Sequence, residues 1–249
     1  MRPALFAILA ADALLLCVVG AASYALARSA LAPLVVARER EERFSADVAH
    51  ELRTPLGAIA SIAQTTAADD ASAAAAALRS IARRATESGE LIADLLTLAR
   101  ASEVESLDCE PVDLAIVADH ARRERTAERR ITLACECESA IVIGDERRLR
   151  QLVRNLLDNA FAHARSRVDL VVTTRNGTAE LCVEDDGPGL DPEVLPHLFE
   201  RFAKGRASSG SGLGLAICRW IVRAHGGDLT YLGGSRFVAR FPEATNPMD

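Results

Sequence analysis

Lysine is almost absent from this chain of 249 residues: Lys204 is the single example, and every other strong cation is an arginine. A Walker A phosphate loop needs a Gly-Lys-Ser/Thr step. A serine/threonine-type protein kinase needs a strand lysine together with His-Arg-Asp and Asp-Phe-Gly elements. None of these motifs occurs in the sequence. Both classes of ATP-using enzyme are therefore excluded.

Aromatic residues are also scarce, at 4% of a chain that is 49% hydrophobic, so the core must be built from alanine, leucine and valine. The cysteines form no C-x-x-C pair and have no histidine cluster beside them, which argues against a zinc site. Cys135 and Cys137, at strand spacing, are interpreted as small apolar side chains on one face, and we expect reduced thiols. The net charge of -6 argues against nucleic-acid binding.

The N-terminus is long and apolar. Residues 3–27 carry one charge, Asp12, and as a helix they would span about 37 Å, enough to cross a bilayer core of roughly 30 Å. The alternative is a cleaved signal peptide ending near Ala27. We favour a single-pass transmembrane helix over residues 1–28, located in the cell (inner) membrane. The arginines that follow it predict a cytoplasmic C-terminal side, and residues 29–43 are interpreted as a juxtamembrane helical linker.

The stretch "FSADVAHELRTPLGAI", residues 44–59, predicts an amphipathic helix. Its apolar stripe comprises Phe44, Val48, Leu52, Leu56 and Ile59. His50 lies two residues past Val48, roughly 200° around the helix, so it points away from the stripe. It is either a solvated surface histidine or a nucleophile with the carboxylate of Glu51 beside it.

A second amphipathic helix is expected after the alanine-rich segment that follows residue 70. Two helices with a short connection form an antiparallel hairpin. Because one hairpin buries little apolar surface, we expect it to pair with a second copy as a four-helix bundle. Residues 44–104 are therefore predicted to form the helical domain of a homodimer.

Residues 110–243 follow an α/β pattern, and residues 244–249 form a tail. We expect helices near 112–127 and 192–200, a long helix from "DERRLRQL" and another from "GLGLAICR". Strands are expected at "ITLACEC", "AIVIGD", "DLTYLG" and "SRFVARF", with a hairpin that turns at Asn176-Gly177. The fold class is thus α+β, with a transmembrane helix, a helical hairpin and an α/β sandwich whose sheet is largely antiparallel.

Three short elements of this last domain suggest chemistry. Asn155 and Asn159 lie one turn apart on a helix and could bind Mg²⁺ and phosphate oxygens, or be ordinary surface asparagines. "DDGPGL", residues 185–190, could present a buried carboxylate to an exocyclic amine, or be a simple Asp-Gly turn. "GSGLGLAI", residues 210–217, could cradle phosphates at a helix start, or be a flexible linker.

In their order and spacing these elements resemble the sensor histidine kinases of two-component systems. "FSADVAHELRTPLGAI" is similar to that family's H-box, "QLVRNLLDNAFAHA" to its N-box, "DDGPGL" and "GSGLGLAI" to its glycine boxes and "LFERFAKG" to its F-box. The resemblance covers about residues 38–242. It implies an ATP-binding domain of the histidine kinase, gyrase and Hsp90 type at 110–243, and a dimerisation and phosphotransfer domain at 44–104.

The resemblance also implies roles for single residues. His50 would accept the γ-phosphoryl group of ATP, Glu51 would be its general base, and Thr54 would position water for dephosphorylating a response regulator. Asn155 and Asn159 would hold phosphates and Mg²⁺, with the choice of metal ligand left open. The nucleotide would further contact Asp185, which receives the adenine amino group, and Gly187, Gly189, Phe199, Phe202, Gly210, Gly212, Leu213 and Gly214. The partner would be the receiver domain of a response regulator.

The sequence departs from the family pattern before the H-box. The family usually has two transmembrane segments around a sensor domain, whereas only one such segment is expected here. Either the protein senses in or through the membrane, or the chain is a shortened form. Two other functions stay open: another ATPase of the same fold, such as a chaperone or topoisomerase, and a non-enzymatic membrane dimer that binds a regulator.

Overall fold

The computed structural model describes residues 19–20, 48–49, 51–64, 71–100, 107–125, 131–205 and 210–244. The chain divides into two units, Met1–Ala58 and Ile59–Asp249. Almost all of the predicted transmembrane segment, and His50 itself, lie outside the described residues. Among the residues that the structure describes, no helix has both the length and the apolar character needed to cross a membrane.

The helical region contains the two helices that the sequence predicts. Residues 51–64 are helical, and α2 runs over Ala71–Arg100. Burial on α2 differs from the single apolar stripe that we expected. Leu91, Leu95 and Leu98 are buried, but Leu78, Ile92 and Leu96 are more than two-fifths exposed. The second, exposed stripe is what a homodimer interface would cover, and the dimer stays a prediction.

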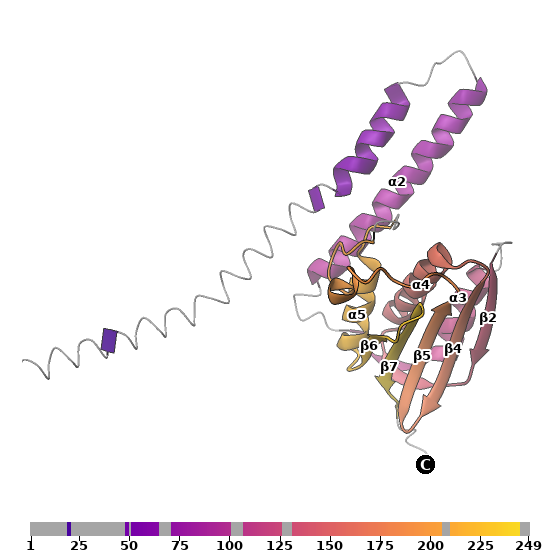
Figure 1. Ribbon diagram of the computed structural model, residues 1–249, viewed down its shortest axis with the longest axis vertical. Coiled ribbons are helices and arrows are strands. Elements are labelled where there is room, and N and C mark those ends of the chain that lie inside the picture. Colours follow the sequence, from indigo (N-terminus) through magenta and orange to yellow (C-terminus); the bar gives the residue numbers. More distant parts are fainter. Residues whose placement is uncertain are drawn as a thin grey trace, which may run out of the picture. The chain divides into compact units, whose positions relative to one another are not determined.

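The C-terminal region contains a five-stranded sheet in the order β2-β4-β5-β7-β6 (Figure 1). The strands are β2 Thr132–Cys137, β4 Arg167–Arg175, β5 Thr178–Asp185, β6 Asp228–Tyr231 and β7 Arg236–Pro242. β2 pairs with β4 in parallel, and all other pairs in this sheet are antiparallel. The prediction of a largely antiparallel sheet is confirmed.

The predicted hairpin is also confirmed. Asn176 and Gly177 join β4 to β5 with φ angles of 52° and 73°. Two successive positive φ angles define a type I′ turn, whose twist matches that of the flanking strands. An Asn-Gly pair tolerates this conformation better than other residues do, which is why the sequence signal was reliable here.

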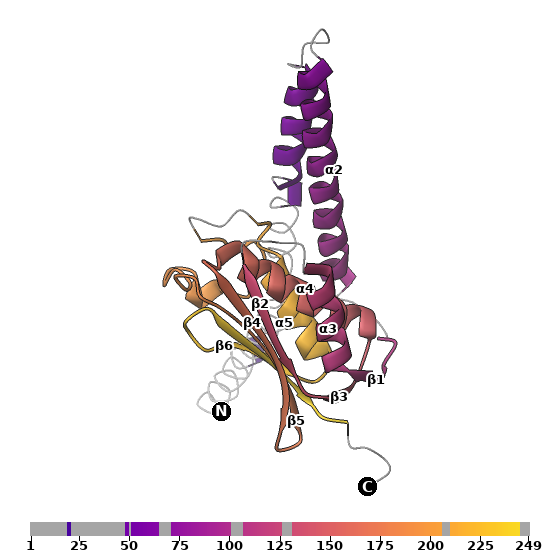
Figure 2. The ribbon, with the colours of Figure 1, turned by 90° about the vertical axis from the view of Figure 1, so that its right-hand side faces the viewer.

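Three helices pack on one face of the sheet (Figure 2): α3 Leu114–Arg125, α4 Glu146–His163 and α5 Gly214–Ala224. The strands supply alternating buried residues to this layer, and Val168, Leu170 and Val172 of β4 are all fully buried. α4 contributes a continuous buried face that includes Leu149, Leu152, Leu156 and Leu157. Aliphatic side chains fill most of this core, and Phe161, Phe237 and Phe241 are buried with them.

The helix expected near 112–127 is present as α3, but the strand that precedes it was missed, and one other element prediction was wrong. A helix was expected from residue 112, but β1 Glu110–Asp113 pairs there with β3 Ile141–Gly144 as a separate two-stranded sheet. The helix starts later because Asp113 Oδ1 accepts from the backbone N–H of Ala115 at 2.9 Å, which caps its first turn. The helix expected at 192–200 is only the 3₁₀ turn Leu195–His197. Prolines 192 and 196 lack the N–H groups that a longer helix needs.

Candidate functional site

Helix α4 presents the two predicted asparagines on its half-buried side. Its N-terminus is fixed by Asp145, whose Oδ1 accepts from the backbone N–H of Arg148 at 3.2 Å. The Nδ2 atom of Asn155 is buried, with the Cys218 thiol beside it, and makes no hydrogen bond of ordinary geometry within the described residues. A buried amide without an acceptor costs free energy unless a ligand supplies one. Asn155 is therefore suited to a ligand oxygen.

The start of α5 lies close to Asn155. A Cβ built on Gly214 would be 4.0 Å from the Cβ of Asn155. Leu213, which precedes this glycine, is fully buried. The second glycine motif and the middle of α4, far apart in the sequence, thus meet at one site, as the sequence motifs predict.

Asp185 ends β5 as a buried carboxylate, with 6% of its surface exposed. Its Oδ1 accepts from the backbone N–H of Gly187 at 2.8 Å. Burial raises the pKa of Asp185 above its usual value, although hydrogen bonds from Gly187 and Ser235 partly oppose this. A carboxylate held in a low-dielectric site can accept a hydrogen bond from an amino group of a ligand.

Gly187 cannot be replaced by a larger residue without displacing this carboxylate. A Cβ at position 187 would clash with Asp185 Oδ1 and would lie 2.5 Å from the backbone oxygen of His163. The turn after β5 therefore packs directly against the C-terminal end of α4. This contact holds the Asp185 side chain in one orientation.

The neighbouring Asp186 has a different role. Its carboxylate accepts from the backbone N–H groups of Arg165 and Ser166 at 2.7 and 3.0 Å and from the Ser166 hydroxyl at 2.6 Å. These hydrogen bonds lower the pKa of Asp186 well below its usual range. Asp186 thus anchors the loop before β4, and only Asp185 is directed inward.

Two polar residues that sequence reasoning missed come from the β6–β7 corner. The Tyr231 hydroxyl accepts from the backbone N–H of Leu190 at 3.4 Å, and Ser235 hydrogen-bonds Asp185. Gly233, Gly234 and Ser235 have successive φ angles of 86°, 57° and 65°. The Gly233-Gly234 pair is the sequence signal for a tight turn here, because glycine readily adopts positive φ angles. Nothing in the sequence indicated that this turn lies beside the first glycine motif, residues 185–190.

A backbone hydrogen bond joins the F-box, residues 198–205, to the loop just before α5. The N–H of Phe202 donates to the carbonyl oxygen of Gly212 at 2.9 Å. Both residues have left-handed backbones, with φ of 63° at Phe202 and 74° at Gly212. Residues 206–209 lie outside the described part of the chain. Phe199 is also fixed, because the Arg219 guanidinium lies 5.1 Å from its ring centroid.

Gly212 and Gly210 should respond differently to alanine. At position 212 a Cβ would lie 2.8 Å from the backbone carbon of Phe202, and φ is already positive, whereas a Cβ at position 210 meets no atom within 4 Å. We expect Gly212→Ala to lower nucleotide affinity about tenfold or more, since strain of about 1–3 kcal/mol opposes the site. Gly210→Ala should lower the affinity less than Gly212→Ala does, because it adds no clash and no strained backbone. Calorimetric titration with ATP measures both, and equal losses in the two variants would refute this account of the loop.

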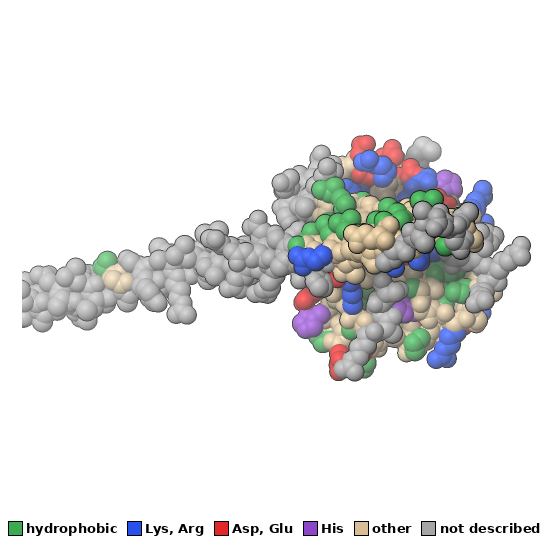
Figure 3. All heavy atoms as spheres, turned by 90° about the horizontal axis from the view of Figure 1, so that it is seen from above, with side chains coloured by type: hydrophobic (Ala, Val, Ile, Leu, Met, Phe, Trp, Pro, Cys, Tyr) green, Lys and Arg blue, Asp and Glu red, His purple; other side chains and the backbone are tan. Residues whose placement is uncertain are grey.

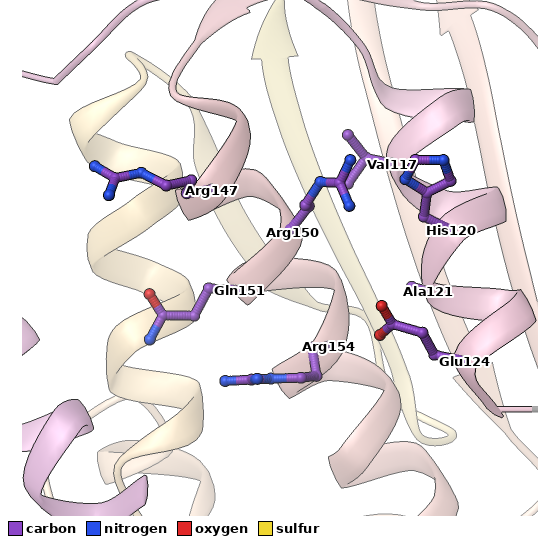
Figure 4. A pocket seen from close by; sticks show the side chains of 8 residues that line it. All are labelled: Val117, His120, Ala121, Glu124, Arg147, Arg150, Gln151 and Arg154. Carbon is purple, nitrogen blue, oxygen red and sulfur yellow. The ribbon is translucent and has the colours of Figure 1, made fainter.

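Two hollows adjoin α4. One, of about 850 Å³, lies between α2 and α4 and is lined by Asn155 together with Glu90, Asp94, Arg125, Arg154 and Asp158, among others. Burial raises the pKa of Asp94 to about 6. The other, of about 350 Å³, lies between α3 and α4 (Figure 4). Arg147, Arg150 and Arg154 of α4 all line this hollow, and Figure 4 shows Arg150 pointing toward His120 while the Arg147 and Arg154 side chains extend away from it. None of the predicted site residues lines this second hollow.

The residues predicted around the nucleophile can be placed only in part. Glu51 is half-buried and Thr54 exposed, both in the helical segment 51–64, while His50 lies outside the described residues. Within the part of the chain that the structure describes, no cluster of three or more His, Cys, Asp or Glu side chains is arranged to hold a metal. Asparagine carbonyls fit Mg²⁺, which takes few protein ligands and keeps several waters.

Charge is mixed over the surface. Figure 3 shows acidic and basic side chains interspersed on the face that it draws, with no single basic field among the described residues there. The overall net charge is -6. These observations agree with the expectation that the protein does not bind nucleic acid, which stays a prediction.

Comparison with protein families gives two matches. Residues 40–103 match the family described as His Kinase A (phospho-acceptor) domain, and residues 144–245 match the family described as histidine kinase-, DNA gyrase B-, and HSP90-like ATPase. The sensor histidine kinase TrcS of Mycobacterium tuberculosis is 40% identical over 226 residues, covering 83% of this chain and 44% of TrcS. BaeS of Escherichia coli, a signal transduction histidine-protein kinase, is 37% identical over 75% of this chain and 42% of its own length. The chain thus spans about half the length of the curated relatives it matches.

Solved structures show the same fold. The histidine kinase AdeS of Acinetobacter baumannii superposes with a TM-score of 0.66 at 24% identity, covering 79% of this chain and 98% of that chain. Full-length ShkA in complex with AMPPNP superposes with a TM-score of 0.60 at 26% identity, over 82% of this chain and 46% of that chain. The likeness to both structures extends over about four-fifths of this chain.

Proposed function

The chain belongs to the sensor histidine kinases of two-component systems, and we propose that it phosphorylates itself on His50 and passes the phosphoryl group to an aspartate of a response regulator. Both catalytic parts of such an enzyme are matched, the phospho-acceptor region at 40–103 and the ATPase region at 144–245. The first match favours a kinase over chaperones or topoisomerases of the same ATPase fold, because those lack the histidine helix.

The nucleotide site is the part with the most detailed support. Asp185 would accept from the adenine amino group, because its buried carboxylate faces inward while Asp186 is fully engaged elsewhere. Gly187 and Gly189 would allow the flat base to approach. The buried Nδ2 of Asn155 would donate to a phosphate oxygen, which removes its unsatisfied state. The complex of ShkA with AMPPNP, an analogue of ATP, supports nucleotide binding by this fold.

The Mg²⁺ site would be formed by the carbonyl oxygens of Asn155 and Asn159 together with water and phosphate oxygens. When bound, Mg²⁺ neutralises charge on the phosphates. Phe199, Phe202 and the glycine loop at 210–214 would cover the phosphates and exclude water. Leu213 would anchor this cover in the core, since it is fully buried.

The phosphoryl-transfer steps would take place at His50, on the helix predicted at residues 44–59. A neutral imidazole nitrogen of His50 attacks the γ-phosphorus, the bond between that phosphorus and the β,γ-bridging oxygen breaks, and ADP leaves. Glu51 accepts the proton from the second ring nitrogen or orients the ring. The resulting phosphohistidine then donates its phosphoryl group to an aspartate carboxylate of the receiver domain.

Two observations in the ATPase region carry this proposal. The buried amide nitrogen of Asn155 makes no hydrogen bond of ordinary geometry, and the buried carboxylate of Asp185 faces inward. The same chain also contains the predicted helix that carries His50. The test uses the full chain with ATP labelled on the γ- or the α-phosphate, in the presence of Mg²⁺. Label from the γ-position only, stable in base and lost in acid, would support the proposal. Label from both positions, or a base-labile and acid-stable product, would overturn it.

Thr54 is proposed to position the water that hydrolyses the phosphorylated regulator. Thr54→Ala should slow this dephosphorylation by roughly 10- to 100-fold, as loss of a water-orienting group does, and leave autophosphorylation within about twofold. The decay of purified phosphorylated receiver domain, with kinase and ADP present, measures the effect. Ser61→Ala, seven residues on along the same helix, is the matched control. An unchanged decay rate in the Thr54 variant would remove the phosphatase role.

Location and assembly are further parts of the proposal. The apolar segment 3–27 supports a single-pass anchor in the cell membrane with the catalytic domains on the cytoplasmic side. The exposed stripe of α2, with Leu78, Ile92 and Leu96, supports a homodimer through a four-helix bundle. A response regulator as the partner is supported by the crystal structure of the histidine kinase ThkA in complex with response regulator protein TrrA.

A further inference from the structure

The C-terminal turns of α2 lie against the ATPase region. Arg148 of α4 donates to the Thr97 hydroxyl at 3.3 Å. Arg201 of the F-box donates to the carbonyl oxygen of Leu98 at 3.2 Å. Both acceptors belong to the last turn of α2. Side chains one turn earlier on the same helix, at position 94 above all, are therefore held close to α4.

Asp94 faces the middle of α4 from this position. Its Oδ1 accepts from Nε2 of Gln151 at 3.5 Å, a long hydrogen bond that leaves most of the carboxylate's capacity unused. The side chain is half-buried. Asp94 and Glu90 of α2 line the hollow of about 850 Å³ together with Asn155. Two carboxylates of the helical region thus share one hollow with the asparagine assigned to the phosphates.

The charges around this hollow do not balance. Three carboxylates and two guanidinium groups line it, which leaves one excess negative charge, and its other lining residues are uncharged. Asp158 pairs with Arg125. Arg154 is then the counter-charge to both Asp94 and Glu90. Burial, opposed by Arg154, raises the pKa of Asp94 to about 6, so this carboxylate is ionised above neutral pH.

We propose that Asp94, assisted by Glu90, is a specificity-determining residue that weakens the binding of ATP relative to ADP and AMP. The inference rests on the proposed nucleotide site, in which Asp185 receives the adenine and Asn155 the phosphates. A carboxylate repels each added phosphate charge, and the repulsion is stronger in a half-buried hollow than in water. The penalty therefore grows from AMP to ATP. Glu90 is exposed, so solvent and ions screen its charge and its share is smaller.

A purely structural role for Asp94 makes a different prediction. Asparagine has nearly the same size, and its side-chain oxygen can still accept from Gln151, so Asp94→Asn removes the charge and little else. A change of shape at this position would alter the affinities for all nucleotides alike. Removal of the charge alters them in the order of their phosphate charge.

The test titrates the full chain at pH 8 with Mg²⁺ and AMPPNP, ADP or AMP, where AMPPNP replaces ATP to prevent turnover. Asp94→Asn should bind AMPPNP about 3- to 10-fold more tightly, ADP with a smaller gain, and AMP within about twofold of the wild type. Glu90→Gln should show the same order with smaller gains. Glu87→Gln is the matched control, because Glu87 is an exposed carboxylate of α2 that pairs with Arg83 and does not line the hollow. It should leave all three affinities unchanged.

Salt provides a second readout of the same repulsion. Raising the NaCl concentration from about 0.05 to 0.5 M should narrow the difference in AMPPNP affinity between the wild type and Asp94→Asn, because ions screen the carboxylate. Equal gains for the three nucleotides, or an AMPPNP affinity that Asp94→Asn leaves unchanged, would overturn the proposal while the nucleotide site stands. A wild type that binds none of the nucleotides would overturn the nucleotide site, and this inference with it.

Discussion

Replacing His50 by glutamine is expected to abolish transfer of the γ-phosphoryl group from ATP to the protein, lowering it by more than about 10³-fold, because the variant lacks the nucleophile. Glutamine keeps a polar side chain of similar length, so the helix and its apolar stripe are preserved. ATP affinity should stay within about twofold, since the nucleotide site lies in the other domain. Incorporation of label from γ-labelled ATP, followed against time, measures the rate.

His120→Gln is the matched control for this experiment. His120 is an exposed histidine of α3 that lines the hollow between α3 and α4. We expect this variant to incorporate label at the wild-type rate. Label that persists in the His50 variant and disappears in the His120 variant would show that the acceptor had been assigned to the wrong helix.

The second large effect is expected at Asp185. Asp185→Asn should lower ATP affinity by roughly 10- to 100-fold, because a hydrogen bond to a charged group contributes about 1.5–3 kcal/mol and the amide presents a donor where an acceptor is needed. The apo protein should not lose stability. The usual pKa of 3.8 is raised in the folded state, so the folded protein holds the proton more tightly than the unfolded chain does.

The sign of the pH effect follows from this shift. Between pH 3.8 and the raised pKa, folded-state stability falls as pH rises, because the buried carboxylate must ionise. Asparagine carries no charge, so Asp185→Asn should melt at a temperature equal to or above that of the wild type near neutral pH. The difference should shrink as the pH falls toward about 4. Melting curves across this range, without nucleotide, check the prediction.

Asp186→Asn provides the contrast one residue away. The pKa of Asp186 is lowered from 3.8 by its hydrogen bonds to Ser166, Arg167 and Arg165, so its charged form stabilises the fold above that pH and the contribution is lost in acid. We expect this variant to melt lower than the wild type and to keep ATP affinity within about threefold. If both variants lost affinity equally, the assignment of the adenine contact to Asp185 alone would be wrong.

Local sequence rules predicted most of the elements that carry the site. The Asn-Gly turn, the long helix from 146 and the glycine motif before α5 are encoded by neighbours in the chain, because they depend on capping, periodicity and permitted φ angles. The strand at 110–113 was missed since it is short and exists through pairing with β3. The helix expected at 192–200 failed because its prolines outweighed its apolar spacing.

The site itself was predictable only as a set of motifs. That Asp185 faces inward and Asp186 outward depends on the loop at 165–166, which is about twenty residues earlier in the chain. Ser235 and Tyr231 reach the first glycine motif through the β6–β7 corner, and no local pattern reports such tertiary contacts. The exposed stripe on α2 likewise differs from the sequence expectation, because one helix can present two apolar faces to two different partners.

The central claim is that the phosphoryl group passes from ATP through His50 to a receiver aspartate. The most direct measurement isolates the labelled full chain, removes all ATP, and adds a purified receiver domain in equimolar amount. The account predicts that label leaves the kinase and appears on the receiver as a base-labile acyl phosphate, and that the His50→Gln protein transfers nothing. Label that stays on the kinase, or that reaches the receiver from ATP through the His50→Gln protein, would contradict it.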